Sequence, residues 1–416
     1  MPANTLPKIN ADRVWERHME MAKIGATPGG GVHRLALTAE DIAAHRLLAE
    51  WAAARSFAVE IDAMGNMFIR RPGSDPSLAA AASGSHTDTQ PNGGRFDGIF
   101  GVLAAFEALE AIDEAGLETR RPLEAIIWNN EEGARFVPGC SGSAVYAGTM
   151  ALDDMLDCRD RDGVTMRACV DALHAALPEA GTRDLGQPLA AFIEAHIEQG
   201  PELEANGNAI GVVSGMQGNR RFRVDVTGED AHSGTTPRVG RKDALVAATD
   251  MAVALREVFW DDEDVVRFTI GQFDVLPGAK SVVPGRASFT IDFRHPSAEI
   301  LRELGDQVAP VCAAHAGPCA VETHQISSAA PVDFPEAMVS RIAAAAERRG
   351  FSSQPIYSGA GHDARYLASL CPAGMIFIPC WRGISHNEAE RAEPGDVAAG
   401  AQVIADVLTE LANSSP

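Results

Sequence analysis

The spacing of apolar positions in the first half of the chain switches repeatedly between a helical and a strand-like period. Apolar residues recur every three or four positions over residues 11–24, 38–55 and 101–116, which predicts three helices. Strands are expected in the short apolar runs at residues 58–70, 79–86, 123–128 and 191–200. Such an alternation indicates an α/β layer, in which polar groups at the strand ends form the ligand site.

The pattern changes after Gly207, where apolar and polar residues begin to alternate with a period of two. This period is typical of an antiparallel sheet with one solvated face. Two helices and a pair of strands are expected further on, with the helices at 242–257 and 298–315 and the strands at 265–275 and 286–294. The resulting order, strand–helix–strand–strand–helix–strand, is that of a ferredoxin-like α+β domain.

The length of 416 residues exceeds the size of a single hydrophobic core, so two domains are expected. We place the ferredoxin-like domain as an insertion at residues 209–325. Residues 1–208 and 326–416 then form the other domain, of the α/β class, around a mixed sheet.

Composition narrows the classes of function. A formal net charge of −22 argues against a nucleic-acid partner and against an anionic membrane surface. The chain has neither a run of about 18 apolar residues nor an apolar segment of the signal-peptide type near its start. Its seven cysteines are dispersed and form no CxxC pair, which fits reduced thiols in the cytoplasm.

The segment SHTDTQPNGGRFDG at residues 85–98 contains a histidine and two aspartates, which a simple loop between two elements does not need. His86 and Asp88 are two positions apart at a strand end and therefore share one face, and Asp97 follows through a glycine-rich loop. Imidazole and carboxylate groups are ligands of a divalent ion such as Zn²⁺. A hydrogen-bonded His–Asp pair that caps the next helix would explain this segment taken alone.

Further polar groups follow other apolar, strand-like segments. Glu131 and Glu132 lie side by side after the strand at 123–128, where adjacent side chains point apart. His196 lies in EAHIEQG, and His386 lies in the polar loop GISHNEAE. Each of these residues alone fits a structural role, but three histidines with two carboxylates at strand ends favour a site for two metal ions.

Seven motifs together resemble the cocatalytic zinc hydrolases of the aminoacylase and carboxypeptidase type. The branch that they resemble is that of the N-carbamoyl-L-amino-acid hydrolases, β-ureidopropionases and allantoate amidohydrolases. The motifs follow one another from about residue 80 to residue 390 and read GSHTDTQPNGGRFDGIFGVLAAFEAL, NNEEGARF, EAHIEQGPELE, GEDAHSGTTP, SVVPGRASFTIDFRH, SGAGHDA and GISHNEAE.

The resemblance implies two divalent metal ions per subunit. His86, Asp97 and His196 would hold one ion, and Asp97 would bridge to a second ion that Glu132 and His386 also hold. Zn²⁺ is the expected metal, and Mn²⁺, Co²⁺ or Ni²⁺ would suit the same ligands.

The resemblance also assigns catalytic roles. Glu131 would be the general base, and Asp88 would hydrogen-bond His86 and fix its tautomer. The inserted domain would be a lid and would join two subunits into a homodimer, in which His232 reaches the partner's site and stabilises the oxyanion. Arg294 would bind the carboxylate of a small substrate. Without the resemblance, His232 and Arg294 would be interpreted as a turn residue and a surface arginine.

Other residues would line the substrate pocket, namely Gln199, Gly359, Gly361, Ser281 and Arg220. Ser281 and Arg220 depart from the family, which usually has asparagine and glutamine there, and Arg238 and Arg365 stand where methionine is usual. These arginines indicate either a more anionic or larger substrate, or ion pairs with acidic residues such as Glu229 or Asp230, and both explanations stay open.

The expected function is therefore that of a metal-dependent hydrolase acting on a linear amide or ureido C–N bond beside a substrate carboxylate. N-carbamoyl amino acids, ureido acids and allantoate-like compounds are the expected substrates. An N-acyl-amino-acid hydrolase or a dipeptidase on the same scaffold is the alternative. A catalytically silent relative would have lost a ligand or the base, and this chain has all of them.

Overall fold

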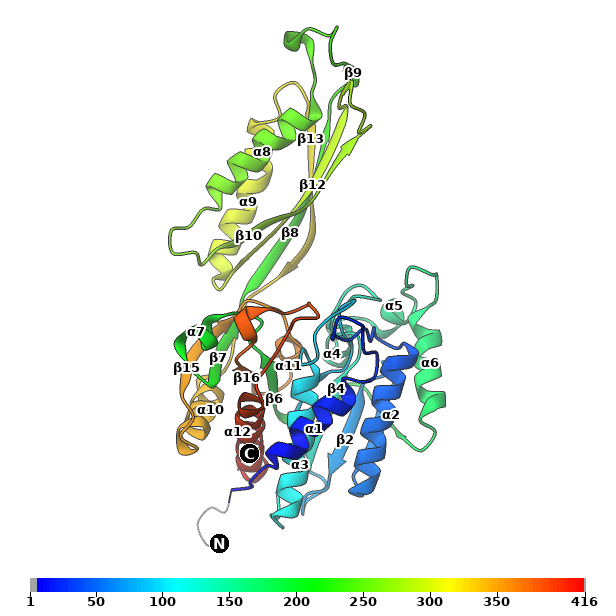
Figure 1. The fold of residues 1–416 in the computed structure, drawn as a ribbon, viewed down its shortest axis with the longest axis vertical. Helices are drawn as coiled ribbons and strands as arrows, with labels where there is room; N and C mark the ends of the chain where they lie inside the picture. Colours follow the sequence, from blue (N-terminus) through cyan, green and yellow to red (C-terminus); the bar gives the residue numbers. More distant parts are fainter. Residues whose placement is uncertain (1–5, 415–416) are drawn as a thin grey trace. The chain divides into compact units, whose positions relative to one another are not determined.

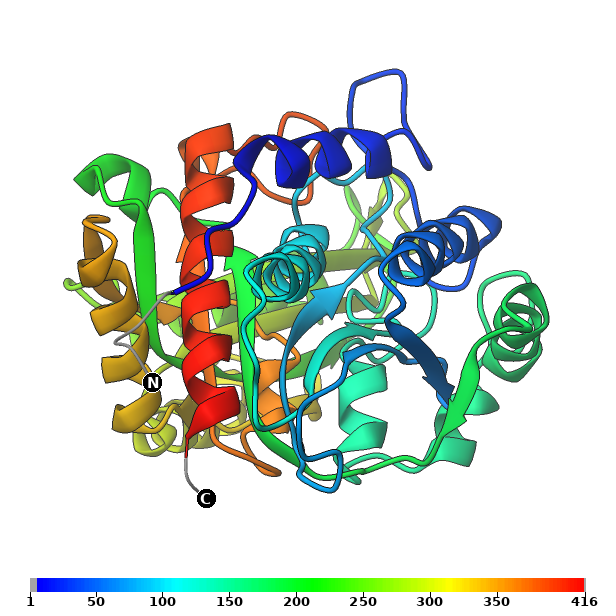
Figure 2. The same cartoon turned by 90° about the horizontal axis from the view of Figure 1, so that it is seen from below.

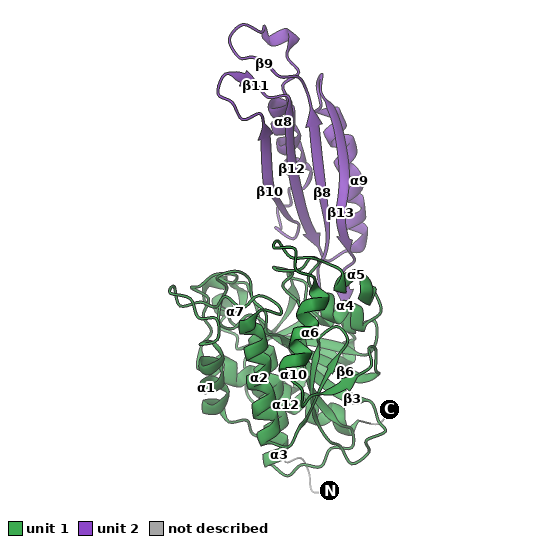
Figure 3. Cartoon of the chain, turned by 90° about the vertical axis from the view of Figure 1, so that its right-hand side faces the viewer, with its two compact units in different colours: residues 1–214, 334–416 green, residues 215–333 purple. Residues whose placement is uncertain are grey.

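The protein has two compact units in a computed structural model that describes residues 6–414. Unit 1 comprises residues 1–214 and 334–416, and unit 2 comprises residues 215–333 (Figure 3). Unit 2 begins six residues later and ends eight residues later than the sequence analysis placed the insertion. The difference arises because residues 210–216 form a strand of the large sheet in unit 1 and are almost all buried.

The large sheet has ten strands in the order β14-β7-β16-β6-β3-β4-β2-β1-β5, with β15 paired to β7. It belongs to unit 1 except for the short strand β14 and the last two residues of β7. Figure 1 labels β7, β16, β6, β4 and β2 of this sheet. The four neighbours β16, β6, β3 and β4 are parallel, whereas β2 and β7 run antiparallel to β4 and β16. An α/β fold with a mixed sheet, as predicted, is thereby confirmed. The strands are β1 (Ala58–Asp62), β2 (Met67–Arg71), β3 (Ala80–His86), β4 (Leu123–Trp128), β5 (Gly181–Arg183), β6 (Leu189–Ile197), β7 (Ile210–Met216), β14 (Val332–Asp333), β15 (Ser353–Ser358) and β16 (Ala373–Ile378).

Helices surround this sheet, and α3 and α12 pack on each other and on β3 (Figure 2). α3 is buried on nearly all sides. Its buried acidic residues have partners, such as Glu107, which pairs with Arg13 at 2.7 Å. The helices of unit 1 are α1 (Ala11–Met21), α2 (Ala39–Ala54), α3 (Ile99–Glu114), α4 (Ser141–Tyr146), α5 (Leu152–Leu156), α6 (Met166–Ala176), α7 (Glu202–Asn206), α10 (Glu336–Arg348), α11 (Ala364–Leu367), η2 (Trp381–Gly383) and α12 (Pro394–Asn413).

Local sequence signals explain where several elements begin and turn. Asn10 and Thr38 accept hydrogen bonds from the backbone amides of Arg13 and Asp41 and so cap α1 and α2. β1 and β2 pair antiparallel, and Gly65 in the turn between them has a φ of +87°, which glycine adopts without strain.

Unit 2 is a four-stranded antiparallel sheet in the order β10-β12-β8-β13, with two helices packed against it. Along the chain the order is β8–α8–β10–β12–α9–β13, which is a split βαβ arrangement. A small two-stranded sheet of β9 and β11 lies at one end of this unit (Figure 3). The elements are β8 (Gly218–Thr227), β9 (Ala231–His232), η1 (Arg238–Gly240), α8 (Ala244–Val258), β10 (Arg267–Leu276), β11 (Val282–Val283), β12 (Arg286–His295), α9 (Ala298–Ala314) and β13 (Ala320–Ala329).

Candidate metal centre

The predicted metal-ligating residues of unit 1 follow the four neighbouring parallel strands. His86 ends β3, Glu132 follows β4 by four residues, His196 is the penultimate residue of β6, and His386 lies in the loop after β16. Because parallel strands place their carboxyl ends at the same edge of a sheet, residues distant in sequence meet there.

Three side chains meet around one oxygen of Asp97. The Nε2 atoms of His196 and His86 lie 3.1 Å and 3.8 Å from Oδ1 of Asp97. All three side chains are almost completely buried. Their ligand atoms lie within 4.8 Å of one another, a spacing at which one divalent ion can contact all three.

A second group forms around the other oxygen of Asp97. Nε2 of His386 lies 3.4 Å from Oδ2 of Asp97 and 3.5 Å from Oε2 of Glu132. The ligand atoms of Asp97, Glu132 and His386 again lie within 4.8 Å of one another. Each oxygen of Asp97 therefore faces a different group.

The hydrogen bonds of the two buried histidines suit metal binding. Nδ1 of His86 donates to the backbone carbonyl of Asp88 at 2.8 Å, and Nδ1 of His196 donates to that of Ile197 at 2.9 Å. In the neutral ring the proton is then on Nδ1, and the unprotonated Nε2 faces Asp97. This is the tautomer that a ligating histidine needs.

The charges of the site also fit cations. Burial and the negative charge of Asp97 raise the pKa of Glu132 to about 7. Burial alone would lower the pKa of His196, but the carboxylate of Asp97, 3.1 Å from Nε2, raises it to about 9, so this nitrogen attracts a positive charge, either a proton or a metal ion. Buried carboxylates so close together repel one another unless positive charge lies among them. The donor set therefore fits divalent cations.

The carboxylate of Asp88 has a different role from the one predicted. It lies 3.7 Å from Nδ1 of His86, whereas the backbone carbonyl of the same residue accepts the hydrogen bond. The carboxylate accepts instead from the backbone amides of Glu131 and Glu132, each at 3.2 Å. The hydrogen bond between Asp88 and His86 is therefore made by the backbone of Asp88, because its side chain is turned toward the loop after β4.

Glu131 lies beside the first group. Its Oε2 is 3.5 Å from Nε2 of His86, and its Oε1 accepts a hydrogen bond from the thiol of Cys140 at 3.2 Å. Burial and the neighbouring carboxylates, first among them Asp363, raise the pKa of Glu131 well above its usual range. A carboxylate with a raised pKa is a stronger base than an exposed one, which favours proton transfer from water.

Comparison with known proteins identifies the family. Residues 82–410 match the family described as peptidase family M20/M25/M40. The chain belongs to this family. Its members are metal-dependent hydrolases, and the two groups around Asp97 are where residues of this M20 chain can hold metal.

Several M20 relatives match along almost their whole length. The N-carbamoyl-L-amino-acid amidohydrolase of Paenarthrobacter aurescens is 38% identical, over 98% of this chain and 99% of the relative. The allantoate amidohydrolase of Escherichia coli is 34% identical, over 94% of this chain and 96% of the relative. Among solved structures, an amidase of the hydantoinase/carbamoylase family from Burkholderia multivorans is 42% identical with a TM-score of 0.91, covering 98% and 99% of the two chains. The predicted family resemblance is confirmed.

Gln199, predicted to line the substrate pocket, lies within the candidate centre. Its Nε2 donates to Oδ2 of Asp97 at 3.0 Å and lies 3.4 Å from Nε2 of His386. Gly359 and Gly361 are in the loop before α11, and no heavy atom lies within 4 Å of where a side chain of Gly359 would begin. This loop leads into His362, whose ring is 4.4 Å from that of His196.

His232 and Ser281 come together within unit 2. His232 pairs with Val282 across β9 and β11, and the backbone carbonyl of Ser281 accepts from the amide of Ser233 at 3.0 Å. Nδ1 of His232 accepts from the backbone amides of Gly234 and Thr235 at 3.0 Å and 3.1 Å. The neutral ring therefore carries its proton on Nε2, and the side chain is exposed.

Arg294 and Arg220 lie at the other end of the unit 2 sheet. Nη2 of Arg294 is 3.4 Å from Asp292. The guanidinium of Arg220 lies over the ring of Phe222 and donates to Gln325 at 2.6 Å. Its Nη1 also lies 3.4 Å from Asp306, so Arg220 pairs with an acidic residue of unit 2.

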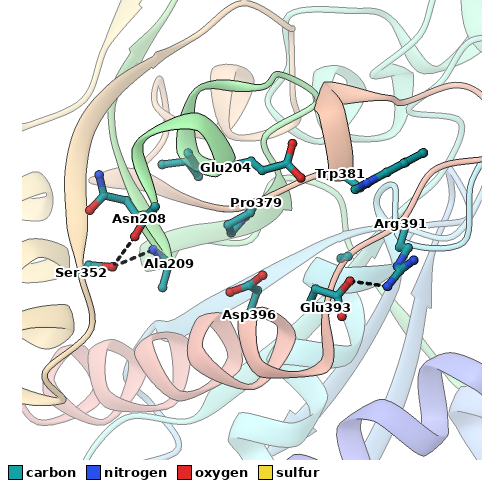
Figure 4. A pocket seen from close by; sticks show the side chains of 12 residues that line it. Glu204, Asn208, Ala209, Ser352, Pro379, Trp381, Arg391, Glu393 and Asp396 are labelled. Carbon is teal, nitrogen blue, oxygen red and sulfur yellow. Dashed lines mark hydrogen bonds and ion pairs between the residues drawn. The ribbon is translucent and has the colours of Figure 1, made fainter.

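A cavity of about 290 Å³ in unit 1 contains none of the predicted site residues (Figure 4). Its walls come from α7, η2 and the start of α12, and they carry Glu204, Glu393 and Asp396. Arg391 also lines the cavity and pairs with Glu393 at 2.7 Å, so the remaining charge is negative and disfavours an anionic substrate there.

Three further residues around the candidate centre were not predicted from the sequence. Cys140 contacts Glu131, and Ser385 and Glu390 contact Asp97 through its side chain and its backbone. A carboxylate four positions after His386 in GISHNEAE was the available signal for Glu390, but acidic residues in polar loops are too common to single out.

Proposed function

We propose that the protein is a metal-dependent amidohydrolase that cleaves a linear amide or ureido C–N bond of a small carboxylate substrate. N-carbamoyl amino acids, ureido acids and allantoate-like compounds are the proposed substrates. The observation that carries this proposal is the pair of donor groups sharing Asp97 beside the buried Glu131. The full-length M20 relatives named for carbamoyl and allantoate hydrolysis support the bond type.

The proposed centre holds two divalent ions, with Zn²⁺ as the expected metal. His86 and His196 would hold one ion and Glu132 and His386 the other, with Asp97 between them. When bound, such ions supply Lewis acidity, which polarises the substrate carbonyl and lowers the pKa of the attacking water.

Glu131 is the proposed base. Its Oε1 is occupied by the thiol of Cys140, so Oε2, on the side of His86, is the oxygen available to take the proton of the attacking water. The same oxygen then returns that proton to the leaving nitrogen as the C–N bond breaks. A carbamoyl substrate would give the amino acid, ammonia and carbon dioxide.

Unit 2 is proposed to complete the site from a partner subunit. Within β12, Arg286 and Arg294 are eight residues apart, which corresponds to about 26 Å at about 3.3 Å per residue. His232 pairs with Val282, beyond the Arg286 end of that strand. Arg294 and His232 of one chain are thus too far apart to contact the same small substrate. We propose that Arg294 binds the substrate carboxylate and that the partner's His232 donates its Nε2 proton to the oxyanion.

A groove of unit 2 that is lined by both apolar and charged side chains supports a homodimer. β10 is an edge strand of the sheet, and a groove of about 660 Å³ lies between it and α8. Val253 and Trp260 line this groove and are 49% and 72% exposed. An exposed apolar patch beside an unpaired strand edge is a surface that a second copy can cover. The Val253→Glu variant should sediment as a monomer, and an unchanged dimer would contradict this interface.

The proposed location is the cytoplasm. All seven cysteines are free in the structure, which suits a reducing compartment. In the described part of the chain, no helix is long and apolar enough to span a membrane.

A substrate panel tests the proposed function. Metal-free protein is reloaded with Zn²⁺ or Mn²⁺ and mixed with N-carbamoyl-L-amino acids, allantoate, N-acetyl amino acids and dipeptides. Ammonia release from the first two classes, abolished by a chelator, is the expected result. Turnover of N-acetyl amino acids or dipeptides alone would identify an acylase or dipeptidase instead, and turnover unaffected by chelation would contradict the metal mechanism.

A further inference from the structure

Glu390 is a buried carboxylate whose partners belong to the candidate metal centre. Its side chain is 1% exposed, and Oε1 accepts from the backbone amides of Phe96 and Asp97 at 2.9 Å and 3.0 Å. These amides belong to the loop that carries the shared ligand Asp97. Burying a carboxylate without hydrogen-bond donors costs free energy, and the two amides supply such donors to Glu390.

The second oxygen of Glu390 reaches the other ligand loop. Oε2 accepts from the hydroxyl of Ser385 at 3.1 Å, and Ser385 immediately precedes His386. Ser385 Oγ also lies 3.0 Å from Oδ2 of Asp97. One carboxylate thereby connects the backbone of Asp97, which belongs to both groups, with the loop that carries a ligand of the second group.

The glycine-rich loop leaves room for this carboxylate. A Cβ atom on Gly94 would lie 1.9 Å from Oε1 and Cδ of Glu390. Real Cβ atoms do not approach other atoms so closely, so any side chain at position 94 would displace the carboxylate. Gly94 therefore explains part of the glycine-rich sequence between His86 and Asp97.

We propose that Glu390 is a positioning residue of the dinuclear centre. It fixes the position of Asp97 relative to the His386 loop, so that both ions can bind. The inference rests on the proposed function, since it assumes that the two groups around Asp97 hold ions. Glu390 itself touches neither the substrate nor the ions. It acts as an acceptor for two backbone amides and one hydroxyl.

The direct test measures metal binding and does not depend on catalytic activity. Purified full-length variants are stripped with a chelator, reloaded with Zn²⁺ and examined for bound ions per chain and for Zn²⁺ affinity against a competing fluorescent chelator. Glu390→Ala should lower the affinity by about 10- to 100-fold, the usual effect of losing a group that orients metal ligands. Glu390→Gln should retain most of the affinity, because its amide oxygen can still accept from both backbone amides and its NH₂ can donate to Ser385.

Two further variants make the result decisive. Gly94→Ala displaces the carboxylate without removing it and should lower the Zn²⁺ affinity by a similar factor. It provides an independent test if Glu390→Ala does not fold. Glu393→Ala is the matched control, because Glu393 lies three residues further on, is exposed and pairs with Arg391 at 2.7 Å. Wild-type affinity in Glu390→Ala, or in Gly94→Ala should Glu390→Ala not fold, would overturn the inference. A wild-type protein that binds no ions would instead contradict the proposed function.

Discussion

The imidazole of His86 is held by the backbone of Asp88 and not by its side chain. Nδ1 of His86 lies 2.8 Å from the carbonyl oxygen of Asp88 and 3.7 Å from its carboxylate. The carboxylate accepts instead from the amides of Glu131 and Glu132. One residue thus supports a ligand of the first group through its backbone and the neighbouring catalytic loop through its side chain.

This division of roles predicts a selective effect of Asp88→Asn. The amide has one acceptor oxygen in place of two, and its NH₂ would face a backbone N–H, so the loop of Glu131 and Glu132 should shift. Turnover should fall by about 10- to 100-fold, as is usual when such a supporting group is lost. Bound ions per chain should fall toward one, because His86 keeps its carbonyl partner. Asp184→Asn, at an exposed position, is the control, and an equal loss of both ions would contradict the prediction.

The adjacent acids Glu131 and Glu132 should behave differently when substituted. Glu131→Gln should bind two ions but lose about 10²- to 10⁴-fold in turnover, the range expected for removal of a general base. Glu132→Ala should lose the ion of the second group, since Glu132 lies 3.5 Å from His386. Elemental analysis of the two purified variants checks this. The same metal loss in both would mean that the roles have been assigned wrongly.

The proposed action of His232 in the partner's site predicts complementation. Glu131→Gln and His232→Ala homodimers should each have low activity for different reasons. In a heterodimer of the two, one site combines an intact Glu131 with an intact His232 from the other chain. Activity should therefore return to as much as about half of the wild-type value per heterodimer. Heterodimers purified with two affinity tags provide the measurement, and no recovery in them would place His232 outside the partner's site.

His18 should make the stability of the protein sensitive to acid. Burial lowers the pKa of His18 to about 4, although its hydrogen bond to the carbonyl of Val14 opposes this. Between pH 6.5 and pH 4 the unfolded state therefore binds more protons at this residue than the folded state. The free energy of unfolding should fall as the pH falls through this range, by about 3 kcal/mol in total.

The variant His18→Phe isolates this contribution. Phe preserves the ring that packs on Phe96 and Phe100 and cannot be protonated. Urea unfolding at pH 7.5 and pH 5 in the presence of a chelator should show a smaller loss of stability in the variant than in the wild type. An identical pH dependence would assign the acid sensitivity to other groups.

Hydrophobic periodicity alone was sufficient to predict the strands and the helix next to the candidate metal centre. The apolar runs before His86 and Glu131 are strands, and the segment after Asp97 is a helix, as predicted. These predictions succeeded because each pattern extends over several residues and reports burial directly. The short strand β7 was assigned to the wrong unit, because IGVVSGM is buried on both faces and its alternation carries no information about the sheet to which it belongs.

The residue types and order of the ligands were determined by the sequence, but how they are held was decided by the tertiary structure. Chain order places His86, Glu132, His196 and His386 after different strands, and only the strand order β16-β6-β3-β4 brings them together. Hydrogen-bond partners such as Glu390 for Asp97 are 293 positions apart. A linear sequence records which donors and acceptors exist, and their pairing depends on distances of a few tenths of an ångström that only the packed chain determines.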